Sequence, residues 1–212
     1  MKTIEFFSGT ASFSKVAKSR GHETLTIDNN PKCKPDILEN ISFEISEKIF
    51  LWLASCDIVW LSPPCQTLSM ASGNKHWTRD RKPKTPEAIE TIRLFKVCER
   101  IAQYCEATGK IYFIENPRAR ARWLLPIENR FTVWYCQYND NRAKPTDIWT
   151  NLKNWIPKTC HNNNKYCHHQ PAPRGSKTGT QGLKKEFRGV IPPQLFNELF
   201  DIIENNELLD IL

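Results

Sequence analysis

The sequence predicts an α/β fold in which a mostly parallel sheet carries helices on both faces, with a small loop-rich segment added late in the chain. Short apolar stretches rich in branched and aromatic residues alternate with stretches of helical periodicity, a pattern typical of parallel sheets. Polar residues directly follow several of the apolar stretches, as expected where parallel strands end. Residues 151–188 are basic and show little periodicity, so they are expected to form loops.

The elements follow from this alternation in chain order. Strands are expected over residues 3–7, 23–28, 35–38, 57–61 and 111–115, with a late pair at 132–137 and 146–150. Helices are expected over residues 13–20, 45–53, 86–108 and 193–203. Thr85 and Pro86 provide an N-cap and a first helical residue, and Gly109 can end that helix. Its expected buried face is Ile89, Ile92, Phe95, Cys98, Ile101 and Cys105.

The stretch Asp57-Ile-Val-Trp-Leu-Ser-Pro-Pro-Cys-Gln66 is central to this prediction. Two prolines fix φ and remove two backbone donors, so the chain must leave the sheet there. Cys65 is thereby held at the carboxyl end of a strand, where open α/β sheets place working groups. The alternative is a Pro-Pro turn with a buried, inert cysteine.

Composition excludes several classes of protein. The chain has 212 residues, 40% of them hydrophobic and 25% charged, which is ordinary for a globular protein. We expect no membrane span, because no apolar run reaches the required length. The first residues show no secretory signal, so the 8 cysteines are expected to be reduced thiols in the cytoplasm.

The net charge of +7 is unevenly distributed. Basic residues concentrate in residues 75–84, 118–122 and 151–188, which favours a surface for a polyanion such as nucleic acid. Scattered, solvated loops are the alternative. Trp149 and Trp155 are expected to be small-core residues, not base-stacking groups.

A tight turn around Gly9 follows the first strand, and Asp28 ends the second. Such a turn with a downstream acid is the usual arrangement for a nucleoside, because the acid accepts hydrogen bonds from ribose hydroxyls. The glycine spacing is not the dinucleotide fingerprint, so this pattern alone leaves a plain structural turn open. Cys65 and Glu115 end later strands.

Several motifs together resemble the DNA (cytosine-5)-methyltransferase family. The matching stretches are Phe7-Ser-Gly-Thr-Ala-Ser12, Asp28, Asp36-Ile37, Ser62-Pro-Pro-Cys-Gln66, Glu115-Asn-Pro117 and Arg188-Gly-Val-Ile-Pro-Pro193, in the family's order. A further tract at residues 172–182 resembles small phage-type members. The resemblance implies a Rossmann-like domain at 1–150, a short target-recognition segment at 151–187, and a return to the catalytic domain at 188–212.

The resemblance also implies site residues. Those expected in catalysis are Cys65, Gln66, Glu115, Asn116 and Arg142. Those expected to bind S-adenosylmethionine are Phe7, Ser8, Gly9, Thr10, Ala11, Asp28, Asn29, Asp36, Ile37, Pro63 and Ile191. Those expected to bind double-stranded DNA are Ser69, Lys75, Arg118, Arg120, Lys144, Arg174 and Lys177. Cys65 would attack C6 of a flipped cytosine, Glu115 would act at N3, and residues 66–84 would close over the base, with Gly73 as a hinge.

The chain departs from the family pattern in places. Ala11 and Ser12 replace usual glycines, and Pro117 replaces a common valine. The family's Gln-x-Arg-x-Arg motif is matched only by Arg142-Ala-Lys144 after Gln137. The region between these residues and Arg188 is short for target recognition, so a short or degenerate target sequence is expected.

A cluster of soft ligands lies at Cys160-His161 and Cys167-His168-His169. Cys160, Cys167 and His168 are considered as zinc ligands, since a loop-rich segment would gain from a metal. Their spacing is not a common zinc-finger spacing. The favoured interpretation is no metal, with a surface loop whose histidines meet phosphates.

Three other functions remain open at this point. An RNA cytosine methyltransferase would have the same basic surface. An amino-group methyltransferase has paired prolines too, although an aromatic residue stands where this chain has Cys65. A non-catalytic nucleic-acid-binding protein could retain the fold. We expect a monomer, and a restriction endonuclease partner is left open.

Overall fold

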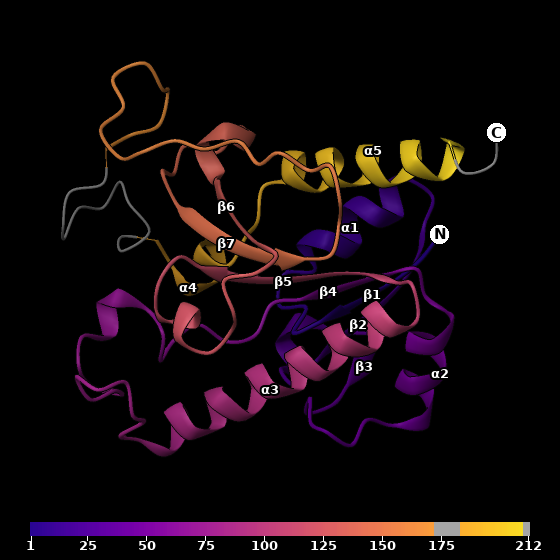
Figure 1. Cartoon of the computed structure of the whole chain (residues 1–212), viewed down its shortest axis with the longest axis horizontal. Helices are drawn as coiled ribbons and strands as arrows, with labels where there is room; N and C mark the ends of the chain where they lie inside the picture. The colour runs from indigo at the N-terminus through magenta and orange to yellow at the C-terminus, as the bar shows by residue number, and fades with distance from the viewer. Residues whose placement is uncertain (172–182, 210–212) are drawn as a thin grey trace.

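The computed structural model describes residues 1–171 and 183–209. A seven-stranded sheet in the order β3-β2-β1-β4-β5-β7-β6 forms its centre (Figure 1). The strands are β1 Lys2–Phe6, β2 Glu23–Asp28, β3 Ile37–Leu38, β4 Ile58–Leu61, β5 Ile111–Pro117, β6 Arg130–Trp134 and β7 Pro145–Thr150. Pairing from β3 to β5 is parallel, whereas β7 pairs antiparallel with both β5 and β6. The predicted α/β fold class, including the late strand pair, is confirmed.

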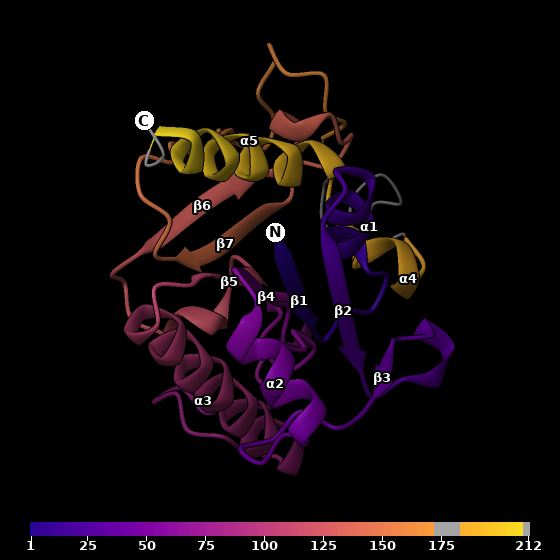
Figure 2. The same ribbon diagram turned by 90° about the vertical axis from the view of Figure 1, so that its right-hand side faces the viewer.

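Helices cover both faces of this sheet. Helices α1 (Ser12–Ser19) and α5 (Pro193–Leu209) lie on one face, and α2 (Glu47–Ser55) and α3 (Pro86–Ala107) lie on the other (Figure 2). Apolar side chains on each face form a separate core. On the α1/α5 face, Phe13 stacks on Trp60 at 5.4 Å, and Phe196 meets Trp60 edge-on at 4.9 Å. The two cores pack on opposite faces of β1 and β4, two of the strands whose ends carry predicted site residues.

Helix α3 begins as its sequence predicts. Thr85 Oγ1 accepts a hydrogen bond from Ala88 N, and Pro86 occupies the first turn. Cys98 and Cys105 are fully buried, and burial raises the pKa of the Cys105 thiol to about 12. The predicted burial of Ile89 is wrong, since 59% of its side chain is exposed. The buried face starts one residue earlier, at Ala88.

The polar segment between β4 and α3 contains a large buried side chain, that of Trp77. Trp77 is buried, donates a hydrogen bond from Nε1 to the carbonyl of Thr67, and packs edge-on against Trp123 at 5.8 Å. A 3₁₀ turn, η2 (Met70–Ser72), lies before it. The buried Trp77 therefore helps to hold this segment against the body of the fold.

The remaining short elements lie around the later strands. They are η1 (Pro31–Cys33), η3 (Arg120–Trp123), η4 (Tyr135–Tyr138) and α4 (Lys185–Arg188). Trp149 and Trp155 are buried, which confirms their predicted place in the core. Among the helices of residues 1–171 and 183–209, none combines the length and apolar character that a membrane crossing needs.

Candidate active site

The turn after β1 holds an unusual backbone. Phe7, Gly9 and Ala11 have φ of 56°, 49° and 51°, in the left-handed region that non-glycine residues rarely adopt. Each such non-glycine residue costs about 1–3 kcal/mol, and strain of this kind clusters at ligand-binding sites. Asp28, at the end of β2, fixes the turn by accepting Gly9 N at 2.8 Å through Oδ2. Its Oδ1 accepts Asn30 N, also at 2.8 Å.

A pocket of about 300 Å³ opens beside this turn. Its lining residues are Phe7, Asp28, Asn29, Asn40, Ile41, Glu90, Arg93 and Leu94. Asp36 and Ile37, expected at the cofactor, are absent from this lining in the described part of the chain. Asp36 instead accepts hydrogen bonds from Thr26 N at 2.9 Å and Thr26 Oγ1 at 2.7 Å. Its carboxylate therefore joins the segment before β3 to the middle of β2.

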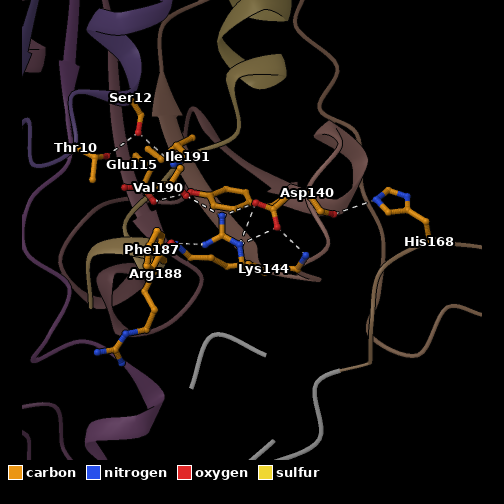
Figure 3. Close-up of polar contacts among 12 residues, drawn as sticks. Thr10, Ser12, Glu115, Asp140, Lys144, His168, Phe187, Arg188, Val190 and Ile191 are labelled. Carbon is orange, nitrogen blue, oxygen red and sulfur yellow. Dashed lines mark hydrogen bonds and ion pairs between the residues drawn. The ribbon is translucent and has the colours of Figure 1, made fainter. Parts of the chain in front are cut away.

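The return segment after α4 reaches the same turn. Ile191 N donates to Ser12 Oγ at 3.4 Å, and Ser12 Oγ lies 2.8 Å from Thr10 Oγ1 (Figure 3). Residues about 180 positions apart thus meet at the carboxyl edge of the sheet. This contact brings Thr10 and Ile191, both expected at the cofactor, to one place.

The end of β4 places Cys65 in a half-buried position. Asn116 Nδ2 donates to the carbonyl of Pro63 at 2.9 Å, which fastens the Pro-Pro turn to the end of β5. Burial raises the pKa of the Cys65 thiol, and the neighbouring Glu115 raises it further. Lys144 and Arg188 oppose these effects through their positive charge. The thiol of Cys65 therefore lies in the electrostatic field of both a carboxyl group and two cations.

Glu115 is buried at the end of β5, beside β4. Burial raises the pKa of its carboxyl group, against the lowering influence of Lys144 and of hydrogen bonds from Ser62 and Tyr135. Tyr135 donates from its hydroxyl to Oε1 of Glu115 at 3.3 Å. A carboxyl group in this setting favours its protonated form and can act as an acid.

Lys144 and Arg142 precede β7 and contact the return segment, and Figure 3 shows Lys144 beside Arg188. Lys144 Nζ donates to the carbonyl of Arg188 at 3.1 Å and lies 4.7 Å from the centre of the Tyr135 ring. Its pKa is lowered by burial, while the charges of Glu115 and Cys65 raise it. Lys144, expected at DNA phosphates, is thus coupled to both predicted catalytic groups.

The guanidinium of Arg142 is engaged within the chain. It pairs with Asp140 through both carboxylate oxygens and donates to the carbonyls of Phe187 at 3.0 Å and Val190 at 2.9 Å. These contacts hold residues 187–190 against the site. Arg142 therefore positions the return segment beside the predicted catalytic groups.

The predicted DNA-binding residues fall into four groups. Lys75 and Arg118 are exposed, and Ser69 and Lys144 are half-buried. Arg120 is a correction: it is only 7% exposed, and its Nη1 donates to the carbonyl of Ser69 at 2.7 Å, so it is committed to holding that loop. Arg174 and Lys177, with the tract 172–182 that resembles phage-type members, lie outside the described residues.

Arg122 is also paired within the fold and is not an exposed cation of the basic surface that the sequence suggests. Its guanidinium forms a bidentate pair with the fully buried Asp147, at 2.6 and 2.7 Å. The cluster of arginines at 118–122 therefore contributes Arg118 alone as an exposed cation.

Three sulfur atoms and one imidazole group form a cluster at η4. The cluster is Cys136, Cys160, Cys167 and His169. The expected ligand His168 lies outside it, and its Nε2 faces the carbonyl of Asp140 at 3.1 Å. His169 takes its place, because its ring is buried with Nδ1 3.9 Å from Sγ of Cys160, whereas His168 is exposed.

Sequence reasoning missed Ser62 and Tyr135 at the acid, Arg188 near the thiol, and Cys136 in the sulfur cluster. Ser62 and Arg188 are the first residues of two motifs that carry the family resemblance, so the sequence could have indicated a role for them. Tyr135 and Cys136 carry no local pattern that marks them. They lie in η4, the connection between the antiparallel strands β6 and β7, and only this tertiary arrangement brings Tyr135 to Glu115 and Cys136 to the other sulfurs.

Comparison with known proteins adds an independent finding. No protein-family profile matches the chain. A frog virus 3 protein named "Probable DNA (cytosine-5)-methyltransferase" is 26% identical over 221 residues, which cover 95% of this chain and 100% of the viral protein. The two proteins are therefore similar along their whole lengths.

Among solved structures, the Entamoeba histolytica methyltransferase EhMeth has a TM-score of 0.51 and 16% identity, covering 78% of this chain. This chain spans 57% of the length of that structure. The Dnmt2 methyltransferase of S. pombe has a TM-score of 0.45 and 14% identity, covering 74% of this chain and 51% of its own. The similarity to EhMeth confirms the Rossmann-like fold.

Proposed function

We propose that this chain, a relative of the DNA (cytosine-5)-methyltransferases, transfers a methyl group from S-adenosylmethionine to C5 of cytosine in double-stranded DNA. The observation that carries the proposal is the meeting of three groups at adjacent strand ends. These are the thiol of Cys65, the buried carboxyl group of Glu115 and the ammonium of Lys144. Each has a chemical task in this reaction.

The cofactor region fits S-adenosylmethionine, which supplies an activated methyl group when bound. The strained turn at Phe7 and Ala11 exposes backbone to a ligand, and Asp28 borders the adjoining pocket. Each oxygen of Asp28 accepts one backbone hydrogen bond, which leaves lone pairs for ribose hydroxyls. From the return segment, Ile191 holds this turn through its backbone N–H, which donates to Ser12 Oγ.

Cys65 supplies the nucleophile. Cytosine C5 is a poor nucleophile, and addition of a thiolate at C6 makes C5 react like an enamine. The attacking species is the thiolate, so any group that favours it accelerates the step. Lys144 and Arg188 favour the thiolate, whereas the ionised form of Glu115 disfavours it.

Glu115 supplies the acid. Charge pushed into the ring is relieved by a proton at N3, and the raised pKa of Glu115 keeps that proton available. A protonated Glu115 also removes the negative charge that opposes the Cys65 thiolate. The two groups therefore favour each other's working forms. Asn116 fixes the turn that carries Cys65, and a base then removes the C5 proton so that the thiol leaves.

The target base must leave the duplex to reach Cys65. Lys75, on the segment anchored by Trp77, and Arg118, just after β5, are exposed cations for the flanking phosphates. Residues 151–187 are proposed as the target-recognition segment. A monomer acting in the cytoplasm of a bacterial or phage-infected host cell is part of this proposal.

Covalent trapping tests the proposal directly. Duplex DNA with 5-fluorocytosine at the target has no C5 proton to lose, so the adduct should persist after methyl transfer. With S-adenosylmethionine present, the wild type and Cys33→Ser should both form a denaturant-resistant protein–DNA species. Cys65→Ser should form none, and it should lose methyl transfer while still binding DNA. An adduct that maps to another cysteine would contradict the assignment.

Methyl incorporation tests whether the substrate is DNA or RNA. Tritiated methyl groups should enter duplex DNA at cytosine C5 and should not enter transfer RNA. Incorporation into transfer RNA alone would replace the DNA substrate with RNA and leave the roles of Cys65 and Glu115 in place. Bisulfite sequencing of DNA from cells that express the chain would then give the target sequence.

A further inference from the structure

Three thiols and one imidazole converge on the outer side of η4. Cys136 comes from η4 itself, and Cys160, Cys167 and His169 come from the segment after β7. One ligand atom from each lies within 4.8 Å of all the others. Three of the four residues are therefore brought to Cys136 by a segment that has no regular secondary structure.

The spacing of these atoms is close to that of a tetrahedral metal site. Zinc bonds of about 2.3 Å to sulfur and 2.0–2.1 Å to nitrogen place neighbouring ligands about 3.6–3.8 Å apart. Sγ of Cys160 lies 3.9 Å from Nδ1 of His169. Three sulfurs and one imidazole nitrogen are also a standard ligand set for structural zinc.

Neighbouring amide groups already point at the sulfurs. Gln137 Nε2 lies 3.5 Å from Sγ of Cys167 and 3.9 Å from Sγ of Cys136, and Asn164 Nδ2 lies 3.4 Å from Sγ of Cys160. N–H donors around thiolates are the usual second layer of a metal site, because they stabilise the negative charge on sulfur. Each of the three sulfurs has such a donor.

In the segment that carries these ligands, the least exposed side chains include the members of the cluster. From Ile156 to Pro171, the described side chains are mostly exposed, and Ile156 and Tyr166 are 86% and 100% exposed. His169 is the one buried side chain in this stretch, while Cys160 and Cys167 are half-buried. The segment projects from the body of the fold (Figures 1 and 2). Its interior is thus formed by the cluster and not by an apolar core.

We propose that Cys136, Cys160, Cys167 and His169 bind one structural Zn²⁺ ion. Four protein ligands close the coordination sphere, so the metal would stabilise the segment and would not activate water. Ordering a stretch of this length costs about 1–2 kcal/mol per residue in backbone entropy, which its few apolar contacts cannot offset. Metal–ligand bonds offset that cost.

The zinc ion would also support the neighbouring active site. Cys136 directly follows Tyr135, whose hydroxyl holds Glu115. Gln170 N donates to the carbonyl of Asn141 at 3.2 Å, and His168 faces Asp140. Asp140 in turn pairs with Arg142. The metal would thus stabilise the neighbours of Tyr135, which holds Glu115, and of Arg142, which holds the return segment. It would contact neither Glu115 nor the return segment.

Metal content tests the proposal on the full chain. Protein expressed with added zinc should contain one zinc per chain by inductively coupled plasma mass spectrometry. His169→Ala and Cys160→Ala should lose most of it, and the matched neighbours His161→Ala and Cys33→Ala should retain it. Zinc below about 0.2 per chain in the wild type, or one full zinc in both ligand variants, would overturn the proposal.

A second measurement uses only the wild type, because a ligand variant could fail to fold. Cobalt-substituted protein should show the visible absorption of a tetrahedral thiolate site. Alkylation mapped by mass spectrometry should spare Cys136, Cys160 and Cys167 until a chelator is added, while Cys33 reacts throughout. A disulfide between any two of the three cysteines in protein trapped directly from cells would overturn the metal assignment. Neither measurement depends on methyl transfer.

Discussion

The hydroxyl of Tyr135 donates a 3.3 Å hydrogen bond to Oε1 of Glu115 and couples η4 to the end of β5. The bond stabilises the ionised carboxylate and so lowers the pKa of Glu115, against the larger upward effect of burial. The acid strength of Glu115 is therefore set partly by a residue from the antiparallel end of the sheet.

Tyr135→Phe should raise the pKa of Glu115, because the phenol no longer stabilises the carboxylate. Catalysis that needs protonated Glu115 is lost as the pH rises through this pKa. The alkaline limb of the rate profile should therefore move to higher pH. Single-turnover methylation from pH 6 to 10 measures it. Tyr112→Phe, whose hydroxyl donates to Glu106 away from the site, is the control and should leave the limb in place.

Lys144→Met should raise the pKa of Cys65, since the ammonium favours the thiolate. Alkylation of Cys65 by iodoacetamide at pH 8, followed by mass spectrometry, should be slower than in the wild type, because the thiolate is the attacking species. Lys144→Arg should keep most of the reactivity because it keeps the charge. Lys75→Met, on an exposed loop, should behave like the wild type. An unchanged rate in Lys144→Met would remove Lys144 from the thiol's surroundings.

The sequence predicts the parallel half of this molecule well, for a physical reason. Cys65, Glu115 and Asp28 each end an apolar strand, and parallel strands deliver their carboxyl ends to one edge. Local periodicity and turn chemistry were therefore enough to place them together. Thr85 and Pro86 likewise fix the start of α3 through their own backbone chemistry.

Other features depend on contacts that no local pattern records. Arg120 and Arg122 look like surface cations in the sequence, yet a backbone carbonyl and the buried Asp147 engage them. Tyr135 reaches Glu115 only because β7 inserts antiparallel between β5 and β6. The sulfur cluster includes His169 instead of His168, a choice between two adjacent histidines that only the folded path of an irregular segment decides.

The arginines at 118–122 can be sorted by experiment. Arg122→Ala should lower the free energy of unfolding by about 3 kcal/mol, because it leaves the fully buried Asp147 without its cation. Arg118→Ala should leave stability within about 0.5 kcal/mol and reduce the salt slope of DNA binding by about one. Urea unfolding and salt-dependent DNA titration measure the two effects. An unaltered salt slope in Arg118→Ala would remove Arg118 from the phosphates.

Glu5 makes stability depend on pH. Its buried carboxyl group has a pKa raised by burial from 4.5 to about 7, against a hydrogen bond from Ser14 N at 2.9 Å. Between these values the native state binds more protons than the unfolded state, so stability should fall as the pH rises from 4.5 to 7. The full effect is about 3 kcal/mol. Urea midpoints at pH 5 and pH 8 should show this loss in the wild type and in the exposed control Glu87→Gln. Glu5→Gln should lack it, and an equal loss there would assign the effect to another group.

The two acids of the cofactor region should separate by function. Asp28 borders the pocket and holds Gly9, whereas Asp36 bonds to Thr26 within the sheet. Asp28→Ala should therefore weaken S-adenosylmethionine binding by about ten- to a hundredfold, as expected when hydrogen bonds to a charged group are lost, and should leave DNA binding intact. Asp36→Ala should lower the unfolding free energy and change cofactor affinity less than about threefold. Calorimetric titration with cofactor, paired with thermal unfolding, measures both variants. If Asp28→Ala binds S-adenosylmethionine like the wild type while Asp36→Ala does not, the nucleoside lies nearer β3 than the pocket at Phe7 indicates.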